Sequence, residues 1–203
     1  MSVEPAFRSA IQEYIRAEAK PVEKYSHQPR LYRLTRQIGK DLRYDDDVVF
    51  AATWLHDLGV FAGHRPEDPE QLGRWDNTAY ACQRAPEVLR RLGFPAEKIP
   101  AVVEAIRTHQ PSADPQTLEG TILRDADILE QLGSVAVLRA VCKIGRDTRF
   151  STFSDVIPVL RKALDSLPER LRLERARELA RGRIASLAGF LRSVEAESGG
   201  ELD

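Results

Sequence analysis

Apolar residues recur every three or four positions along most of the chain, and this spacing is typical of amphipathic helices. Residues 5–19 form the first such segment, and Pro21 closes it. The same pattern predicts further helices at residues 26–42, 48–57, 77–92, 98–108, 117–132, 133–143, 153–166 and 169–196. No convincing strand pattern of alternating apolar and polar residues is present. We therefore expect an all-α protein whose residues 1–203 form a single-domain helical bundle.

Residues 48–57 differ from the other predicted helices because they are apolar almost all round, which places this helix at the centre of the fold. The segment ends in His56 and Asp57. Burying this pair costs free energy unless a partner compensates. One partner would be a divalent cation, for which imidazole nitrogen and carboxylate oxygen are good ligands. The alternative is structural: His56 would bond a backbone carbonyl, and Asp57 would form an ion pair with an arginine.

Two further histidines are expected at helix ends. His27 lies at the beginning of the second helix, where Ser26 could act as the N-cap. His109 follows the helix of residues 98–108, and Pro111 prevents that helix from continuing. Two interpretations of His109 stay open. It could act as a general acid or extend a metal site, or it could interact with the dipole at the end of the helix.

The connection at residues 60–76 contains two prolines and two glycines, which exclude a regular helix. A connection of this length is often functional and could form a flap over a site. It contains His64, which we interpret as a surface loop residue in preference to a catalytic one. The three acids at residues 45–47 are interpreted as the cap and first turn of the following helix, in preference to a metal site.

Composition narrows the classes of function. The 203 residues are 42% hydrophobic and 30% charged, as in ordinary soluble globular proteins, and the formal net charge is −1. No overall positive field favours nucleic acid, and no apolar run is long enough to cross a membrane. Cys82 and Cys142 lie far apart and form no CxxC pair, so both are expected to be buried thiols in a reducing cytoplasm. The apolar residues of the last predicted helix could serve a homodimer.

Four segments of the chain form a pattern: His27 followed by the helix RLYRLTRQI, the segment AATWLHDLG, the segment VVEAIRTH that ends in His109, and the segment ILRDADILEQLG. Together they resemble the HD superfamily of metal-dependent phosphohydrolases. The resemblance covers roughly residues 25–135 and implies an HD-domain-like helical core there. The remaining part, at about residues 136–197, is then a C-terminal helical extension.

The resemblance implies a metal site made of His27, His56, Asp57 and Asp127, with Asp125 as the rival for the last position. The ion would be Mn, Fe, Co, Ni, Zn or Mg, and it would activate a water molecule for attack on a phosphoester. The implied substrate is a small phosphorylated molecule, in particular a nucleotide. Asp57 and His109 are the expected catalytic residues.

Binding of a phosphate group requires positive charge beyond the ion, and an arginine can supply it through a bidentate contact. Three arginines are candidates for substrate binding. Arg30 lies close to His27 in the sequence, while Arg146 and Arg149 belong to a short, charge-dense loop after the predicted helix of residues 133–143.

The chain departs from the family pattern just after the His-Asp doublet. Many relatives carry a lysine or glutamate there that takes part in the chemistry, whereas this chain has Gly59, Val60 and Phe61. The departure keeps a second function open, that of an HD-fold protein that binds metal or nucleotide without turnover. A third is a di-iron oxygenase of the same fold, which would need further histidine ligands, with only His64 and His109 available.

Overall fold

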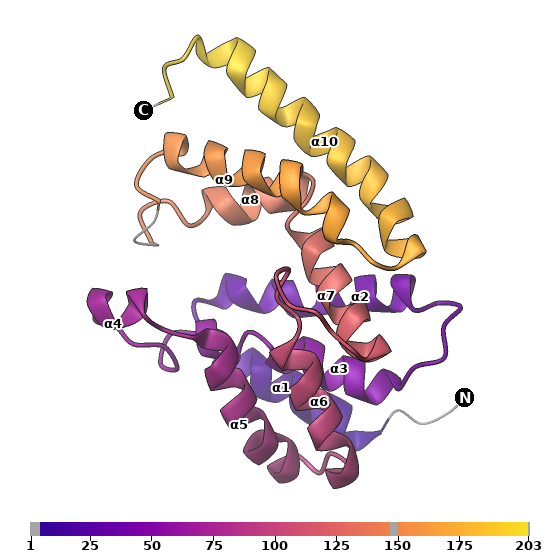
Figure 1. Cartoon of the computed structure of the whole chain (residues 1–203). Helices are drawn as coiled ribbons and strands as arrows, with labels where there is room; N and C mark the ends of the chain where they lie inside the picture. The colour runs from indigo at the N-terminus through magenta and orange to yellow at the C-terminus, as the bar shows by residue number, and fades with distance from the viewer. Residues whose placement is uncertain (1–4, 147–149, 203) are drawn as a thin grey trace. The chain divides into compact units, whose positions relative to one another are not determined.

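The computed structural model describes residues 5–146 and 150–202. Within these ranges the chain is built from helices joined by turns and loops (Figure 1). The only extended pairing in these ranges is an isolated bridge between Ala62 and Arg65. The expectation of an all-α fold is confirmed. The chain divides into two compact units, Met1–Arg124 and Asp125–Asp203.

The described part of the first unit consists of helices joined by turns and irregular loops, and the longer helices match the predicted segments. Its elements are α1 (Ala6–Glu18), the 3-10 turn η1 (Val22–Ser26), α2 (His27–Ile38), α3 (Asp46–Leu55), η2 (Leu58–Val60), α4 (Pro69–Gly73), α5 (Asn77–Arg91), η3 (Ala96–Lys98) and α6 (Ile99–Arg107). The next helix, α7 (Leu118–Glu130), begins in the first unit and ends in the second. The second unit continues with α8 (Ser134–Val141), α9 (Phe153–Ser166), η4 (Pro168–Arg170) and α10 (Glu174–Ser198).

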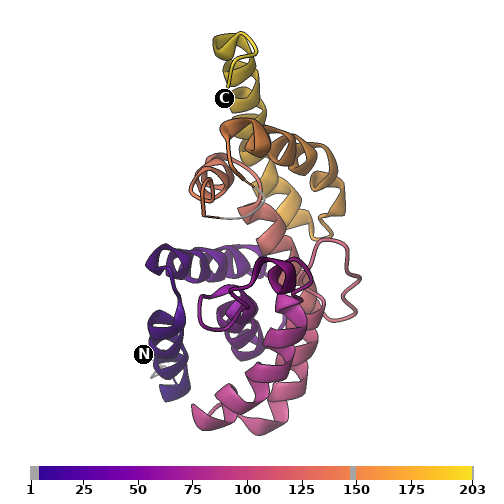
Figure 2. The same ribbon diagram turned by 90° about the vertical axis from the view of Figure 1, so that its left-hand side faces the viewer.

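The central helix of the first unit is α3. All of its residues from Val48 to Leu55 are buried. The helix packs against α1, α2, α5 and α6, which lie around it (Figure 2). This confirms the central position that its apolar sequence predicts. The helix ends two residues earlier than expected, at Leu55, so that His56 caps it and Asp57 lies beyond its last turn.

Three consecutive acids fix the beginning of α3. Asp45 is the N-cap, and its side chain accepts hydrogen bonds from two backbone N–H groups of the first turn. Asp46 and Asp47 accept hydrogen bonds from the guanidinium group of Arg8, at 2.8 and 2.6 Å. Lys98 also donates to Asp45 and Asp47, at 3.1 and 2.9 Å. The structural interpretation of these acids is therefore confirmed.

A buried carboxylate fixes the beginning of α10 in the second unit. The side chain of Asp125 is fully buried, and its Oδ2 accepts hydrogen bonds from the backbone N–H groups of Arg172 and Leu173, at 3.0 and 2.8 Å. Helix α10 begins at the next residue, Glu174. The negative charge of Asp125 thus lies at the positive end of the helix dipole, where it is stabilising.

The apolar face of α10 packs against α8 and α9. Its buried residues are Ala176, Ala180, Leu187 and Leu191. Among the described residues of the second unit, the large exposed apolar side chains are instead Leu138 on α8 and Phe153 and Val159 on α9. The homodimer stays a prediction, but the last helix does not supply these exposed residues. None of the described helices is both long and apolar enough to cross a membrane.

Three local expectations are wrong. Cys142 is exposed and Cys82 is only partly buried, so the two thiols are not both in the core. The side chain of Ser26 makes no capping bond at the beginning of α2; its hydroxyl instead accepts a hydrogen bond from Arg30 at 2.9 Å. The connection at residues 60–76 contains the short helix α4, which begins at Pro69, a residue that is tolerated in a first helical turn.

Candidate metal centre

Three of the expected ligands meet in the first unit. His27 is the first residue of α2, His56 caps the end of α3, and Asp57 follows directly. Nε2 of each imidazole lies 3.6 Å from Oδ2 of Asp57, and one ligand atom from each residue lies within 4.8 Å of the others. Both histidines are buried, whereas the Asp57 side chain is 23% exposed. The cluster therefore meets solvent through its carboxylate.

The backbone of α3 orients the ring of His56. Its Nδ1 lies 2.9 Å from the carbonyl oxygen of Thr53, one turn earlier in the chain. A carbonyl can only accept, so Nδ1 carries the proton and Nε2 keeps its lone pair toward Asp57. The bond from His56 to a backbone carbonyl, which the sequence predicts for a histidine with a purely structural role, is thus present. The same bond also orients Nε2 as a metal ligand would require.

The donor set fits a divalent cation. Ligand atoms that each lie about 2.1 Å from one ion are roughly 3 to 4 Å apart, depending on the angle between them. The two distances of 3.6 Å to Asp57 Oδ2 fall in this range. Two neutral imidazoles and one carboxylate are ligands that Zn, Mn, Fe, Co and Ni all accept. A cation would also compensate the charge of Asp57 beside two buried rings.

The two aspartates considered for the fourth position, Asp125 and Asp127, belong to the second unit. Oδ2 of Asp125 is engaged by two backbone N–H groups at the beginning of α10. Asp127 is 9% exposed, and its Oδ2 accepts a hydrogen bond from Gln131 at 3.1 Å. The role of Asp127 as a ligand stays a prediction.

His109 lies beside the cluster but is not one of the converging ligands. Its ring is 1% exposed and stands edge to face against the ring of His56, with 4.9 Å between the centroids. Nδ1 lies 2.5 Å from the carbonyl oxygen of Ile106, near the end of α6, so the interaction with the helix end is present. Nε2 lies 3.2 Å from Nε2 of Gln110 and accepts its hydrogen bond. The catalytic role of His109 stays a prediction.

The interpretation of His64 as a surface loop residue is wrong. Its side chain is only 10% exposed, because it lies between two partners from other helices. Nε2 is 2.7 Å from Oε2 of Glu18 at the end of α1, and Nδ1 is 2.9 Å from the hydroxyl of Tyr80 in α5. Glu18 is 46 residues away in the chain, so the local sequence contains no signal for this contact.

The three arginines considered for substrate binding differ in position. Arg30 is partly buried in the second turn of α2, and its guanidinium donates to Ser26, the residue before His27. Arg146 is exposed in the second unit. Arg149 lies outside the described residues. All three assignments stay predictions.

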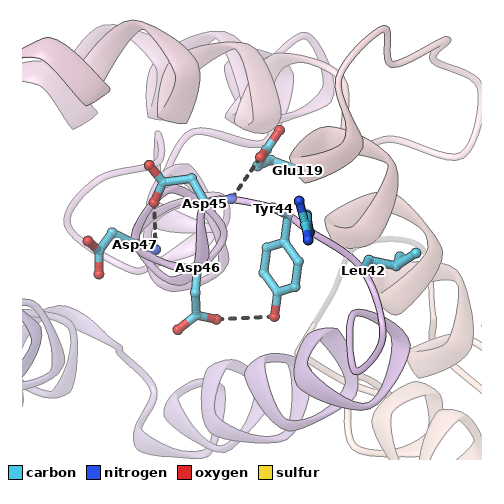
Figure 3. Close-up of a pocket in the computed structure, with 7 residues that line it drawn as sticks. Leu42, Tyr44, Asp45, Asp46, Asp47 and Glu119 are labelled. Atoms are coloured by element: carbon cyan, nitrogen blue, oxygen red, sulfur yellow. Dashed lines mark hydrogen bonds between the residues drawn. The ribbon is translucent and has the colours of Figure 1, made fainter. Parts of the chain in front are cut away.

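Figure 3 shows a second group of acids, in a surface hollow lined by residues 42–47 and Glu119. The backbone N–H of Asp45 donates to Glu119 at 2.9 Å, and the hydroxyl of Tyr44 donates to Asp46 at 3.3 Å (Figure 3). Burial and the nearby charge of Asp46 raise the pKa of Tyr44 to about 12. Since these acids already bond to the fold, the hollow is structural, and a convergence of ligands within the described residues occurs at His27, His56 and Asp57 instead.

In this all-α protein, two imidazoles and a carboxylate converge at the end of a buried helix and form a candidate metal centre. The sequence model of the HD domain family matches residues 25–132, more than half of the chain, and the chain belongs to this family. The resemblance read from the sequence is thereby confirmed. HD domains are metal-dependent, and the group formed by His27, His56 and Asp57 could bind such an ion. A comparison with curated proteins gives no match.

Several solved structures share the fold. YpgQ from Bacillus subtilis is 22% identical, with a TM-score of 0.74 over 96% of each chain, and it has also been determined in complex with ADP. A protein from Lactobacillus plantarum is 21% identical, with a TM-score of 0.73 over 98% of this chain and 100% of the other. A protein from an uncultured Thermotogales bacterium, described as a predicted HD superfamily hydrolase, is 24% identical, with a TM-score of 0.63 over 93% and 91%.

Proposed function

We propose that this protein is a metal-dependent phosphohydrolase that cleaves a phosphoester of a nucleotide or of another small phosphorylated metabolite. The observation that carries the proposal is the convergence of His27, His56 and Asp57, with Nε2 of both rings 3.6 Å from the same Asp57 oxygen. Membership of a metal-dependent hydrolase family supports it. The complex of the related YpgQ with ADP supports a nucleotide as the first substrate to test.

His27, His56 and Asp57 would hold the ion, and Asp127 is the proposed fourth ligand. Asp125 is the weaker alternative, because two backbone N–H groups already bind its Oδ2. When bound, the ion would polarise a phosphoryl oxygen and lower the pKa of a water ligand. The identity of the metal, among Mn, Fe, Co, Ni, Zn and Mg, is an outcome of the experiment below.

Side chains of the protein would handle the protons. The Asp57 carboxylate would orient the attacking water by accepting a hydrogen bond from it. His109 would act as the general acid toward the leaving oxygen. Because its Nδ1 is committed to Ile106, any proton that His109 gains goes to Nε2. Gln110 donates to that nitrogen in this structure, so the amide of Gln110 must turn away before His109 can be protonated there.

Arg30, Arg146 and Arg149 are the proposed contacts to the phosphate groups, since a guanidinium binds phosphate in a bidentate manner. Arg30 has the best support, because its guanidinium lies within hydrogen-bond distance of Ser26, directly before the proposed ligand His27. For Arg146 and Arg149 the support is the sequence alone.

The experiment begins with metal analysis of the purified protein. Hydrolysis is then measured on a panel of phosphoesters and nucleotides with Mn, Co, Ni, Mg and Fe. Asp57→Ala is expected to abolish both metal binding and turnover. Asp165→Asn, a change of an exposed acid on α9, is the matched control and should leave both unchanged. Metal-dependent release of phosphate by the wild type that survives in Asp57→Ala would contradict the proposal.

Two other functions are distinguished by the same measurements. Tight metal binding without turnover on any substrate would identify a silent HD-fold binding protein, which the lack of a lysine or glutamate after the doublet favours. Two irons per chain and consumption of oxygen would identify a di-iron oxygenase. This function has less support, because His64 is held by Glu18 and Tyr80 and His109 by Ile106 and Gln110.

A further inference from the structure

His64 connects three parts of the first unit that are far apart in the sequence. Its Nε2 is 2.7 Å from Glu18 at the end of α1, and its Nδ1 is 2.9 Å from the hydroxyl of Tyr80 in α5. Both ring nitrogens are therefore engaged, and the side chain is only 10% exposed. A charge-assisted contact to a carboxylate is among the stronger hydrogen bonds in proteins. The ring is thus fixed in position and orientation.

The backbone next to His64 is fixed at the same place. The N–H of Ala62 donates to the carbonyl of Lys20 at 3.0 Å, just beyond the end of α1. Phe61 is 1% exposed, and its ring lies 6.3 Å from that of His64. The segment from Phe61 to His64 is consequently anchored on α1 through one side-chain contact and one backbone contact.

A second anchor acts on the residue two positions after Asp57. The indole N–H of Trp75 donates to the carbonyl of Gly59 at 2.8 Å, and the Trp75 ring packs on that of Tyr80 with 5.2 Å between the centroids. Tyr80 therefore belongs to both anchors. Gly59 also lies against α5, since a Cβ at this position would be 2.6 Å from the carbonyl oxygen of Asn77.

The backbone of Asp57 is bonded to the anchored segment, whereas His56 is bonded to α3. His56 is held by α3 itself, through bonds to the carbonyls of Ala52 and Thr53. Asp57 lies beyond the end of α3, with φ −95° and ψ 11°, and its carbonyl accepts a hydrogen bond from Val60 at 2.9 Å. The segment that follows Asp57 therefore helps to set the backbone position of Asp57.

We propose that His64, together with Glu18 and Tyr80, forms a latch that holds the segment after Asp57 and so positions the Asp57 carboxylate for cation binding. His64 is then a positioning residue and touches neither ion nor substrate. This inference rests on the cation site of the proposed function.

The test measures the affinity of metal-free protein for Mn²⁺ by calorimetric titration, alongside thermal unfolding without metal. Changes in residues that support a metal ligand typically cost about 10- to 100-fold in affinity. We expect His64→Ala to weaken Mn²⁺ binding by about 10-fold or more. His64→Gln keeps a donor and an acceptor and should recover part of the loss. Tyr80→Phe, which removes one hydrogen bond, should have a smaller effect than His64→Ala.

The matched control lies on the same connection. Glu70 on α4 and Arg74, directly after α4, form an ion pair with both side chains largely exposed, at 77% and 81%. The double variant Glu70→Ala/Arg74→Ala should bind Mn²⁺ like the wild type. A role of His64 in stability alone would lower the midpoint of thermal unfolding and leave the Mn²⁺ affinity of the folded protein unchanged, and that result would overturn the latch.

A second variant and the titration of the wild type separate failure of the latch from failure of the cation site. If His64→Ala does not fold, Glu18→Gln removes the charge of the latch at a partly exposed position, and wild-type Mn²⁺ affinity in that variant would overturn the inference. Absence of Mn²⁺ binding in the wild type would overturn the latch and the cation site together. Wild-type binding with no effect of any latch variant would overturn the latch alone.

Discussion

Removal of Arg8 is expected to destabilise the first unit without altering the residues of the metal centre. The Arg8 side chain is 10% exposed and donates to Asp46 at 2.8 Å, to Asp47 at 2.6 Å and to the hydroxyl of Tyr32 at 2.8 Å. Its guanidinium carbon also lies 4.7 Å from the centroid of the Phe50 ring. Arg8→Met keeps much of the apolar stem and removes every donor.

The size of the effect follows from the burial of the partners. Breaking a buried ion pair costs about 3–5 kcal/mol. Here the side chains of Asp46 and Asp47 are 31% and 24% exposed, so water can solvate part of their charge. Lys98 also still donates to Asp47 at 2.9 Å, and both effects offset part of the loss of stability. We therefore expect Arg8→Met to lower the free energy of unfolding by about 2–4 kcal/mol at pH 7.

The free energy of unfolding that Arg8→Met loses should also depend on pH, and the direction of this dependence follows from the pKa of Asp47. Burial alone would raise the pKa of Asp47, but the hydrogen bonds from Arg8 and Lys98 outweigh burial, and the pKa is lowered in the folded protein. A carboxyl group with a lowered pKa stabilises the fold above its unfolded pKa of about 4, and this contribution is lost as the pH falls through the folded value. The difference between wild type and Arg8→Met should therefore narrow in acid.

Urea unfolding followed by circular dichroism, at pH 7 and below about pH 4, measures both effects. Arg107→Met is the control, because Arg107 pairs with Glu104 on the surface of α6 and is 62% exposed. Its removal should change stability little. A loss for Arg8→Met of less than about 1 kcal/mol at pH 7, the range of surface pairs, would refute the reasoning. So would a loss of the same size at both pH values.

Gly59→Ala is expected to cost about 1–3 kcal/mol of unfolding free energy, because its Cβ would lie 2.6 Å from the carbonyl oxygen of Asn77; an unchanged midpoint of thermal unfolding would contradict this. Asp125→Ala removes the acceptor of two backbone N–H groups at the beginning of α10, at an expected cost of about 2–4 kcal/mol. Faster hydrogen exchange of those two amides is the check, and unchanged exchange would argue against the anchor. Mn²⁺ at 100 times its Kd should stabilise the wild type by about 2.7 kcal/mol and Asp57→Ala by almost nothing; equal shifts would place the ion elsewhere. Tyr44, with a pKa of about 12, should stay protonated at pH 11, so ultraviolet titrations of wild type and Tyr44→Phe should coincide up to that pH.

Features set by neighbouring residues could be predicted from the sequence. The apolar run before His56 predicts a buried central helix, and Val48–Leu55 are all buried. The acids at residues 45–47 are typical of a helix N-terminus, and they cap α3. The pairing of His56 with Asp57, and the family pattern that adds His27, were sufficient to identify the three residues that converge; their role as metal ligands stays a prediction.

Features that depend on distant partners could not be predicted in the same way. His64 looks like a loop residue because its partner Glu18 lies 46 positions earlier, at the end of another helix. This contact is visible only once the chain is folded, since propensity describes local conformation and not tertiary contacts. Ser26 is a different case, because the serine hydroxyl accepts a hydrogen bond from Arg30 only one turn later, and this local side-chain contact competes with the cap.

The ion pair between Arg8 and Asp47 lies at the beginning of helix α3, and the His56–Asp57 doublet follows its other end. Ten residues of α-helix span about 15 Å, so the two ends share few direct contacts. Substitutions at sites this far apart generally have additive effects on stability. The stabilisation that Arg8 gives to the beginning of α3 should therefore persist in variants of the doublet, and under the proposed function such variants would serve as traps with which to capture the substrate from cell extracts.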